Sequence, residues 1–110
     1  MKIAIPTAGG ILCSHFGHCE QFALVEVAEG TITGITWLTP PPHEQGALPK
    51  FLKESGANMI ISGGMGWRAQ QFFRDFGIEV LIGAPSLQPN EVVTAYLAGT
   101  LTTGDNLCDH

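Results

Sequence analysis

Glycine and proline divide this chain into short segments, and this division limits the possible folds more than any other sequence feature. Between these breaks, short apolar runs alternate with segments whose apolar residues recur at helical spacing. The short runs predict five strands, over residues 2–5, 22–28, 31–39, 58–62 and 79–82. The periodic segments predict three helices, from near Ala47 to a stop at Gly56, over about 67–76, and from about Asn90 to Ala98.

The predicted order β-β-β-α-β-α-β-α is typical of an α/β fold with a single five-stranded mixed sheet and flanking helices. Glu29-Gly30 is a plausible hairpin turn, and Gly34 a possible bulge. If the first two connections both reverse the chain, the third strand runs parallel to the first. The right-handed crossover rule then makes the last two strands parallel as well. We expect one domain over residues 1–110, with residues 100–110 as a C-terminal tail.

This topology brings four loops to one edge of the sheet. The first, third, fourth and fifth strands would all end there, followed by the loops over 6–20, 40–46, 63–66 and 83–88. Ligands of open α/β sheets bind beyond the carboxyl ends of the parallel strands. We therefore expect a site at this edge, whereas the sequence does not place the tail.

The first of these loops holds the densest group of metal-binding side chains. Residues 13–19 read Cys-Ser-His-Phe-Gly-His-Cys and contain two of the three cysteines and two of the four histidines. Thiolate and imidazole suit zinc and softer metals. Four ligands from one heptapeptide would be strained, which favours an open site completed by other side chains or by a bound cluster. The predicted metal ligands are Cys13, His15, His18, Cys19, His43, Cys108 and His110.

Each of these assignments has a simpler alternative. Cys13 and Cys19 could form a disulfide or be inert buried thiols. His43 could be a surface loop histidine, and the terminal Cys108-Asp109-His110 could be a solvated end. The composition does not decide between these alternatives, so they stay open at this point.

A glycine loop precedes the second helix. Gly63, Gly64, Met65 and Gly66 would offer backbone N–H groups and the positive end of a helix dipole to an anionic ligand, and Arg68 could add donors. The loop lacks the Gly-Lys-Ser/Thr of a phosphate-binding Walker motif. A tight strand-to-helix turn with a solvated arginine is an equally good interpretation.

Charge and composition exclude several functions. The net charge is −5, and the five lysines and arginines form no run, which disfavours binding to nucleic acid or to an anionic membrane. The sequence has neither a membrane-spanning apolar stretch nor a signal-peptide core, so we expect a cytoplasmic protein. In a reducing cytosol three cysteines indicate metal or redox chemistry. No cluster of carboxylates supports a nuclease, and only the Cys–His pairs could support a thiol enzyme.

Four motifs match a known family over nearly the whole chain: His-Phe-Gly-His-Cys at 15–19, Pro-Pro-His at 41–43, Gly-Gly-Met-Gly-x-Arg-Ala at 63–69 and Cys-Asp-His at 108–110. With them the chain resembles the dinitrogenase iron–molybdenum cofactor biosynthesis family. That family includes NifX-like proteins and the carboxyl-terminal domain of NifB-like proteins.

The resemblance implies a ribonuclease-H-like sheet without nuclease activity, in small non-enzymatic proteins that bind, carry or protect metal–sulfur clusters. The expected cargo is a cluster of Fe–S, Fe–Mo or Mo–Cu type, and the expected partners are cluster donor or acceptor proteins. Residues 13–19 would supply direct ligands, His43 and the terminal Cys108 and His110 would complete or cover the site, and the glycine loop with Arg68 would hold the anionic cargo. A regulatory or scaffold protein that binds zinc or another single ion is the alternative.

Overall fold

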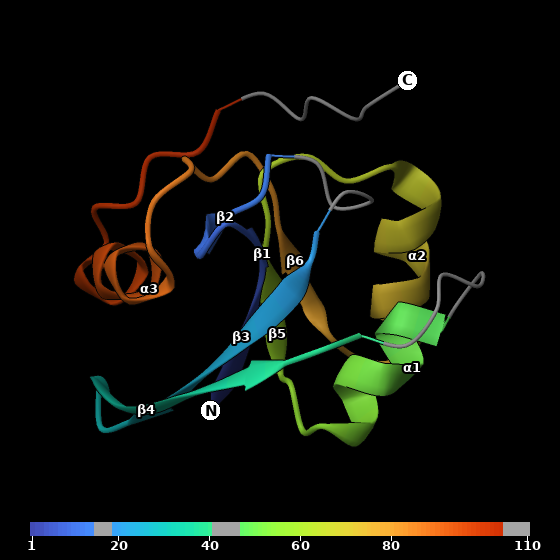
Figure 1. Cartoon of the computed structure of the whole chain (residues 1–110), viewed down its shortest axis with the longest axis horizontal. Coiled ribbons are helices and arrows are strands. Elements are labelled where there is room, and N and C mark those ends of the chain that lie inside the picture. The colour runs from blue at the N-terminus through green and yellow to red at the C-terminus, as the bar shows by residue number, and fades with distance from the viewer. Residues whose placement is uncertain (15–18, 41–46, 105–110) are drawn as a thin grey trace.

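Strands from both halves of the chain lie side by side in one mixed sheet (Figure 1). A computed structural model describes residues 1–14, 19–40 and 47–104. The strands are β1 Lys2–Ala8, β2 Ile11–Leu12, β3 Gln21–Ala28, β4 Thr31–Leu38, β5 Met59–Ile61 and β6 Glu79–Leu81. Their order is β4-β3-β1-β5-β6, and β2 pairs with β1. The helices are α1 Ala47–Glu54, α2 Trp67–Asp75 and α3 Pro89–Ala98.

The strand directions follow the prediction. β3 is antiparallel to both β1 and β4, while β5 is parallel to β1 and to β6. Strands β1, β4, β5 and β6 therefore run the same way and end at the same edge of the sheet. The predicted α/β class and mixed sheet are confirmed. The described residues contain no helix long and apolar enough to cross a membrane.

The first strand differs from the prediction in length. The sequence predicts an end at Pro6, but β1 continues through Pro6 to Ala8. Proline lacks only the backbone donor, and its carbonyl still accepts the N–H of Cys13 at 2.8 Å. The two residues of β2 then pair with Thr7 and Ala8, which gives six strands instead of five. So short a strand has no periodicity of its own and could not be found in the sequence.

The β3–β4 hairpin forms where the sequence predicts it. Glu29 and Gly30 both have positive φ, at 53° and 74°, as a tight turn that follows the strand twist requires. The pairing register shifts between Glu26 and Val27, and this shift leaves Thr33, the neighbour of Gly34, as the extra residue. The predicted bulge is thus confirmed next to Gly34.

Helices cover both faces of the sheet, with α3 on one side and α1 and α2 on the other (Figure 1). Alternate residues of β1 serve the two cores, because side chains along a strand point to opposite faces. Ile3 and Ile5 pack with the α3 residues Val92 and Val93. On the other face, Ala4 packs in a cluster that includes Phe22, Leu24, Leu48, Leu52, Met65 and Phe73. Burial on both faces explains why the central strands are continuously apolar.

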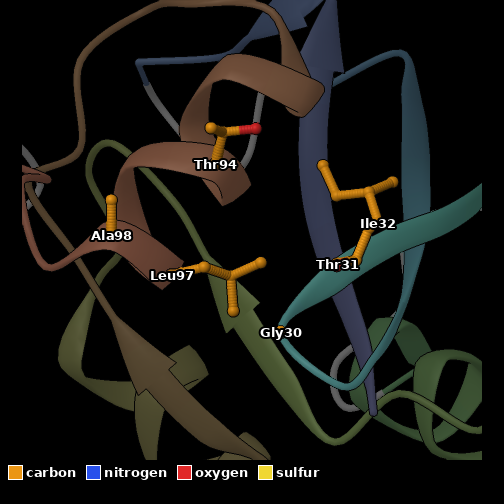
Figure 2. A pocket seen from close by; sticks show the side chains of 6 residues that line it. All are labelled: Gly30, Thr31, Ile32, Thr94, Leu97 and Ala98. Atoms are coloured by element: carbon orange, nitrogen blue, oxygen red, sulfur yellow. The ribbon is translucent and has the colours of Figure 1, made fainter.

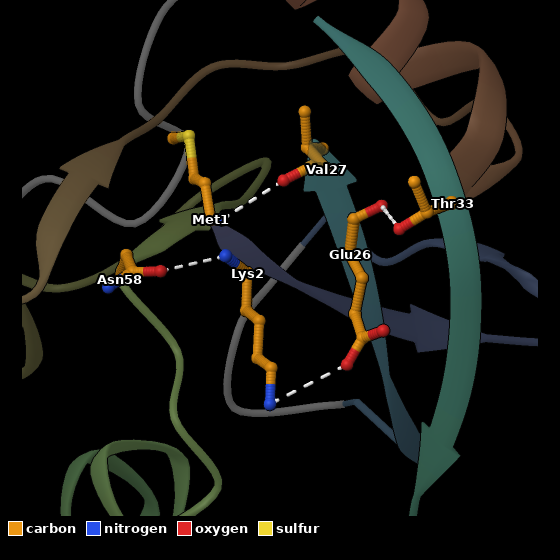
Figure 3. A network of polar contacts seen from close by, with 6 residues as sticks. All are labelled: Met1, Lys2, Glu26, Val27, Thr33 and Asn58. Carbon is orange, nitrogen blue, oxygen red and sulfur yellow. Dashed lines mark hydrogen bonds and ion pairs between the residues drawn. The ribbon is translucent and has the colours of Figure 1, made fainter. Parts of the chain in front are cut away.

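Polar contacts fix the amino-terminal end of β1, opposite the loop edge (Figure 3). The terminal ammonium group donates to the Val27 carbonyl at 3.0 Å, and the Lys2 N–H donates to the Asn58 side-chain oxygen at 2.7 Å. The Lys2 side chain also pairs with Glu26 at 3.5 Å. These contacts connect β1 to β3 and to the start of β5, so the register of the central strands is fixed from this end.

Candidate metal centre

The structure describes two of the seven predicted metal ligands, Cys13 and Cys19. These two residues flank the segment 15–18. The remaining predicted ligands lie outside the described residues: His15, His18, His43, Cys108 and His110. Within the described ranges, no three His, Cys, Asp or Glu side chains gather into a group that could hold a metal ion. The complete ligand set therefore stays a prediction, and the described part supplies two of its three thiols.

Cys13 is held by the end of the sheet. Its N–H donates to the Pro6 carbonyl at 2.8 Å, and the preceding Leu12 N–H donates to the Leu87 carbonyl at 2.9 Å. The side chain is only 8% exposed. The short strand β2 therefore brings the first thiol to the end of β1 and buries it there.

Cys19 lies at the other end of the same loop. The next residue, Glu20, donates its N–H to the Thr7 carbonyl at 2.7 Å, and its carboxylate accepts the Gly9 N–H at 2.8 Å. The Cys19 side chain is half-buried against the core that faces α1 and α2. Both ends of the segment that carries the predicted ligands are thus fixed to the last residues of β1.

The environment of Cys19 keeps its thiol protonated. Burial, together with a smaller electrostatic contribution from Cys13, raises the pKa of this thiol from 9.0 to about 11. A hydrogen bond from the backbone acts in the opposite direction but is weaker. The two sulfur groups therefore lie close enough to interact. A metal ion that binds Cys19 must displace a proton, because the thiolate is the form that binds metal.

The glycine loop packs against the first loop at this edge. A Cβ atom on Gly63 would lie 2.8 Å from the Ser14 Cα and 3.0 Å from the Cys13 carbonyl oxygen, closer than real contacts allow. The adjacent Gly64 N–H donates to the Ser14 carbonyl at 2.6 Å. Only glycine permits this approach, so the turn into α2 positions Cys13. The Gly64 amide, one of the predicted anion donors, is engaged by Ser14.

Two further glycines continue this contact toward the tail. The Gly83 N–H donates to the Gly63 carbonyl at 2.5 Å, and the Gly104 N–H donates to the Gly83 carbonyl at 2.6 Å. The predicted meeting of the loops 6–20, 63–66 and 83–88 is therefore confirmed. The chain returns to this edge at Gly104, shortly before Cys108 in the sequence. Gly83 and Gly104 were missed by the sequence analysis, because an isolated glycine does not reveal its partner.

The remaining residues of the predicted anion site separate into buried and exposed ones. Met65 is fully buried in the core, and its carbonyl accepts a side-chain N–H of Gln70 at 2.9 Å. Arg68 is exposed and stacks on Trp67, 5.8 Å from the ring centre. Trp67 was also missed by the sequence analysis, although its place directly after Gly66 was a usable signal.

A separate cavity of about 440 Å³ lies between the β3–β4 turn and α3 (Figure 2). Its lining residues are small or apolar: Gly30, Thr31, Ile32, Thr94, Leu97 and Ala98. The lining offers no thiol, imidazole or charged group. This cavity is therefore not a candidate metal site, and the loop edge remains the candidate.

Comparison with known proteins identifies the family of this chain. Residues 1–99 match the family described as dinitrogenase iron-molybdenum cofactor. The chain belongs to this family. An uncharacterised protein of Methanocaldococcus jannaschii is 31% identical over 106 residues, which cover 92% of this chain and 89% of the relative.

Solved structures of similar proteins share the fold of this family member. The crystal structure of PH0822 has a TM-score of 0.87 and 29% identity, with 94% of each chain covered. The apo form of the orange protein from Desulfovibrio gigas has a TM-score of 0.76 and 22% identity, with 96% of this chain and 93% of that chain covered. At that identity the second likeness concerns the fold alone.

Proposed function

We propose that this protein binds and carries a metal–sulfur cluster of Fe–S, Fe–Mo or Mo–Cu type, without catalysing a reaction. One observation supports this proposal above all. Cys13 and Cys19 are thiols at the two ends of one anchored loop, close enough for Cys13 to raise the pKa of Cys19. The chain also belongs to a family linked to iron–molybdenum cofactor handling, which supports a metal–sulfur cluster as the ligand of these two thiols.

The chemistry of the Cys13 and Cys19 thiols suits a metal cluster that is bound and later released. Burial disfavours an unpaired thiolate, so Cys19 is a neutral thiol until a metal replaces its proton. A soft metal in a sulfide cluster binds thiolate strongly. His15 and His18 are the predicted further ligands, and His43, Cys108 and His110 are predicted to complete or cover the site. The expected partners are cluster donor and acceptor proteins in the cytoplasm. The proposal also keeps the prediction that the fold is ribonuclease-H-like.

Anaerobic reconstitution tests the proposal directly. Metal-free protein is incubated with iron and sulfide, or with thiomolybdate and copper, and then freed of excess reagent. We expect bound labile sulfide and charge-transfer bands in the visible spectrum. Serine at Cys13 or Cys19 should abolish these signals. Ser55→Ala, a change directly after the carboxyl end of α1 and away from the loop edge, is the control and should load normally. Full loading of the double serine variant would show that the ligands are wrong.

Zinc binding is the second candidate, because cysteine and histidine are the usual ligands of structural zinc. The same preparation distinguishes the two candidates. Stoichiometric zinc without sulfide would support a regulatory or scaffold protein. Protein that takes up neither zinc nor a cluster would exclude both functions.

A further inference from the structure

Positive charge is concentrated on one layer of this acidic protein. Helices α1 and α2 contain four of the five basic residues and two of the ten acidic ones, which gives this layer a formal charge of +2. The rest of the chain has one lysine and eight acidic residues, which gives −7 and accounts for the total of −5. Both helices lie on the same side of the sheet, with α3 on the other (Figure 1). The basic residues of the layer are Lys50, Lys53, Arg68 and Arg74.

These cations are available to a partner. All four side chains are exposed, and among the described residues no carboxylate lies within ion-pair distance of any of them. Arg74 donates to the Gln70 side-chain oxygen at 3.3 Å, a neutral contact. The Lys53 ammonium lies 3.9 Å from where a Gly77 Cβ would be, so it reaches across to the end of α2. The four charges thus lie exposed on the two helices that share one side of the sheet, and we name the exposed surface of these helices the α1–α2 face.

An apolar groove lies on the same surface. It has a volume of about 200 Å³, and its lining residues are Trp67, Arg68, Gln71, Phe72 and Asp75. Trp67 is 62% exposed, the most exposed of the large hydrophobic residues of the described part. Tryptophan and arginine are the residues that most often dominate the binding energy of protein interfaces. Trp67 directly follows the glycine loop, so this groove begins beside the candidate metal centre.

We propose that the α1–α2 face docks an acidic partner protein that exchanges the cargo, with an apolar side chain of the partner in the groove beside Trp67. This inference rests on the proposed function for the identity of what is exchanged. The basic face would steer and orient the acidic partner. Four separate cations are too few for a nucleic acid or an anionic membrane, and the charge of −7 elsewhere repels such extended polyanions.

The test uses metal-free protein and a defined probe, a glutamate-rich peptide with one central leucine. Binding is measured by titration calorimetry and by tryptophan emission. We expect saturable binding that weakens as salt is added, with a shift in emission that Trp67→Ala removes. The variant Lys50→Gln/Lys53→Gln should lose about tenfold in affinity. The control Thr31→Glu/Asn90→Asp makes the same change in net charge on the other side of the sheet and should stay within about twofold.

Three results would overturn the inference. The first is that the lysine variant and the control bind the peptide with equal affinity. The second is that the protein binds a DNA oligonucleotide or phosphatidylserine vesicles more tightly than the peptide. The third is that the protein self-associates in a salt-sensitive way that masks this face. Cluster loading of the lysine variant is measured separately, without peptide, and should match the unmodified protein. Normal loading without peptide binding would overturn only the docking surface. Failure of both proteins to load would overturn the proposed function.

Discussion

Replacing Gly63 with alanine should test whether the glycine loop positions Cys13. The added Cβ would lie 2.8 Å from the Ser14 Cα and 2.9 Å from the Ser14 oxygen, whereas ordinary contact begins at 3.4 Å. Both obstructing atoms belong to the backbone and cannot rotate away. The two loops must therefore separate by roughly half an ångström or more.

The net cost combines two unfavourable contributions with one that partly offsets them. Overpacking of this kind costs about 1–3 kcal/mol. Weakening the hydrogen bond from Gly64 to Ser14 adds about 0.5–1.5 kcal/mol. Alanine also restricts the unfolded chain, which offsets about 0.4–1 kcal/mol. We expect a net loss of about 2–3 kcal/mol in the free energy of unfolding, together with weaker cluster loading because Cys13 is displaced.

Urea unfolding monitored by circular dichroism measures this loss. Gly66→Ala is the matched control: Gly66 has a φ of −64°, and a Cβ there would meet no atom within 4 Å. Its free energy of unfolding should stay the same or rise by up to about 1 kcal/mol, because alanine restricts the unfolded chain and fits here without strain. Equal stability of the two variants would refute the idea that Gly63 holds the Cys13–Ser14 segment in place.

Three further predictions concern other parts of the molecule. The fold raises the pKa of Cys19 from 9.0 to about 11, so the protonated thiol favours the folded state. Its contribution to the free energy of unfolding should be complete below pH 9 and disappear toward pH 11. Cys19→Ser should remove this loss of stability at alkaline pH, as measured by urea titration. Phe73→Ala, in the core under α2, should cost about 3–5 kcal/mol by the same assay. Lys2→Ala should cost less than about 0.5 kcal/mol, because its ion pair with Glu26 is exposed, and a larger loss would contradict this view.

The sequence by itself determined the order of the elements other than β2 and the edge at which the loops meet. These features depend on local signals. Alternating or helical spacing of apolar residues is visible within one segment, and Glu29-Gly30 and Gly99 mark a turn and a helix end through their own backbone preferences. Strand direction then followed from general rules of chain connection.

The tertiary structure decided what depends on contacts between distant segments. Pro6 stays within β1 because Cys13 supplies the donor that bonds to its carbonyl. The pKa of Cys19 is high because packing removes water from its sulfur. Gly63, Gly83 and Gly104 look alike in the sequence, and only the fold shows that they touch in turn. Such contacts join residues far apart along the chain, and no local pattern encodes them.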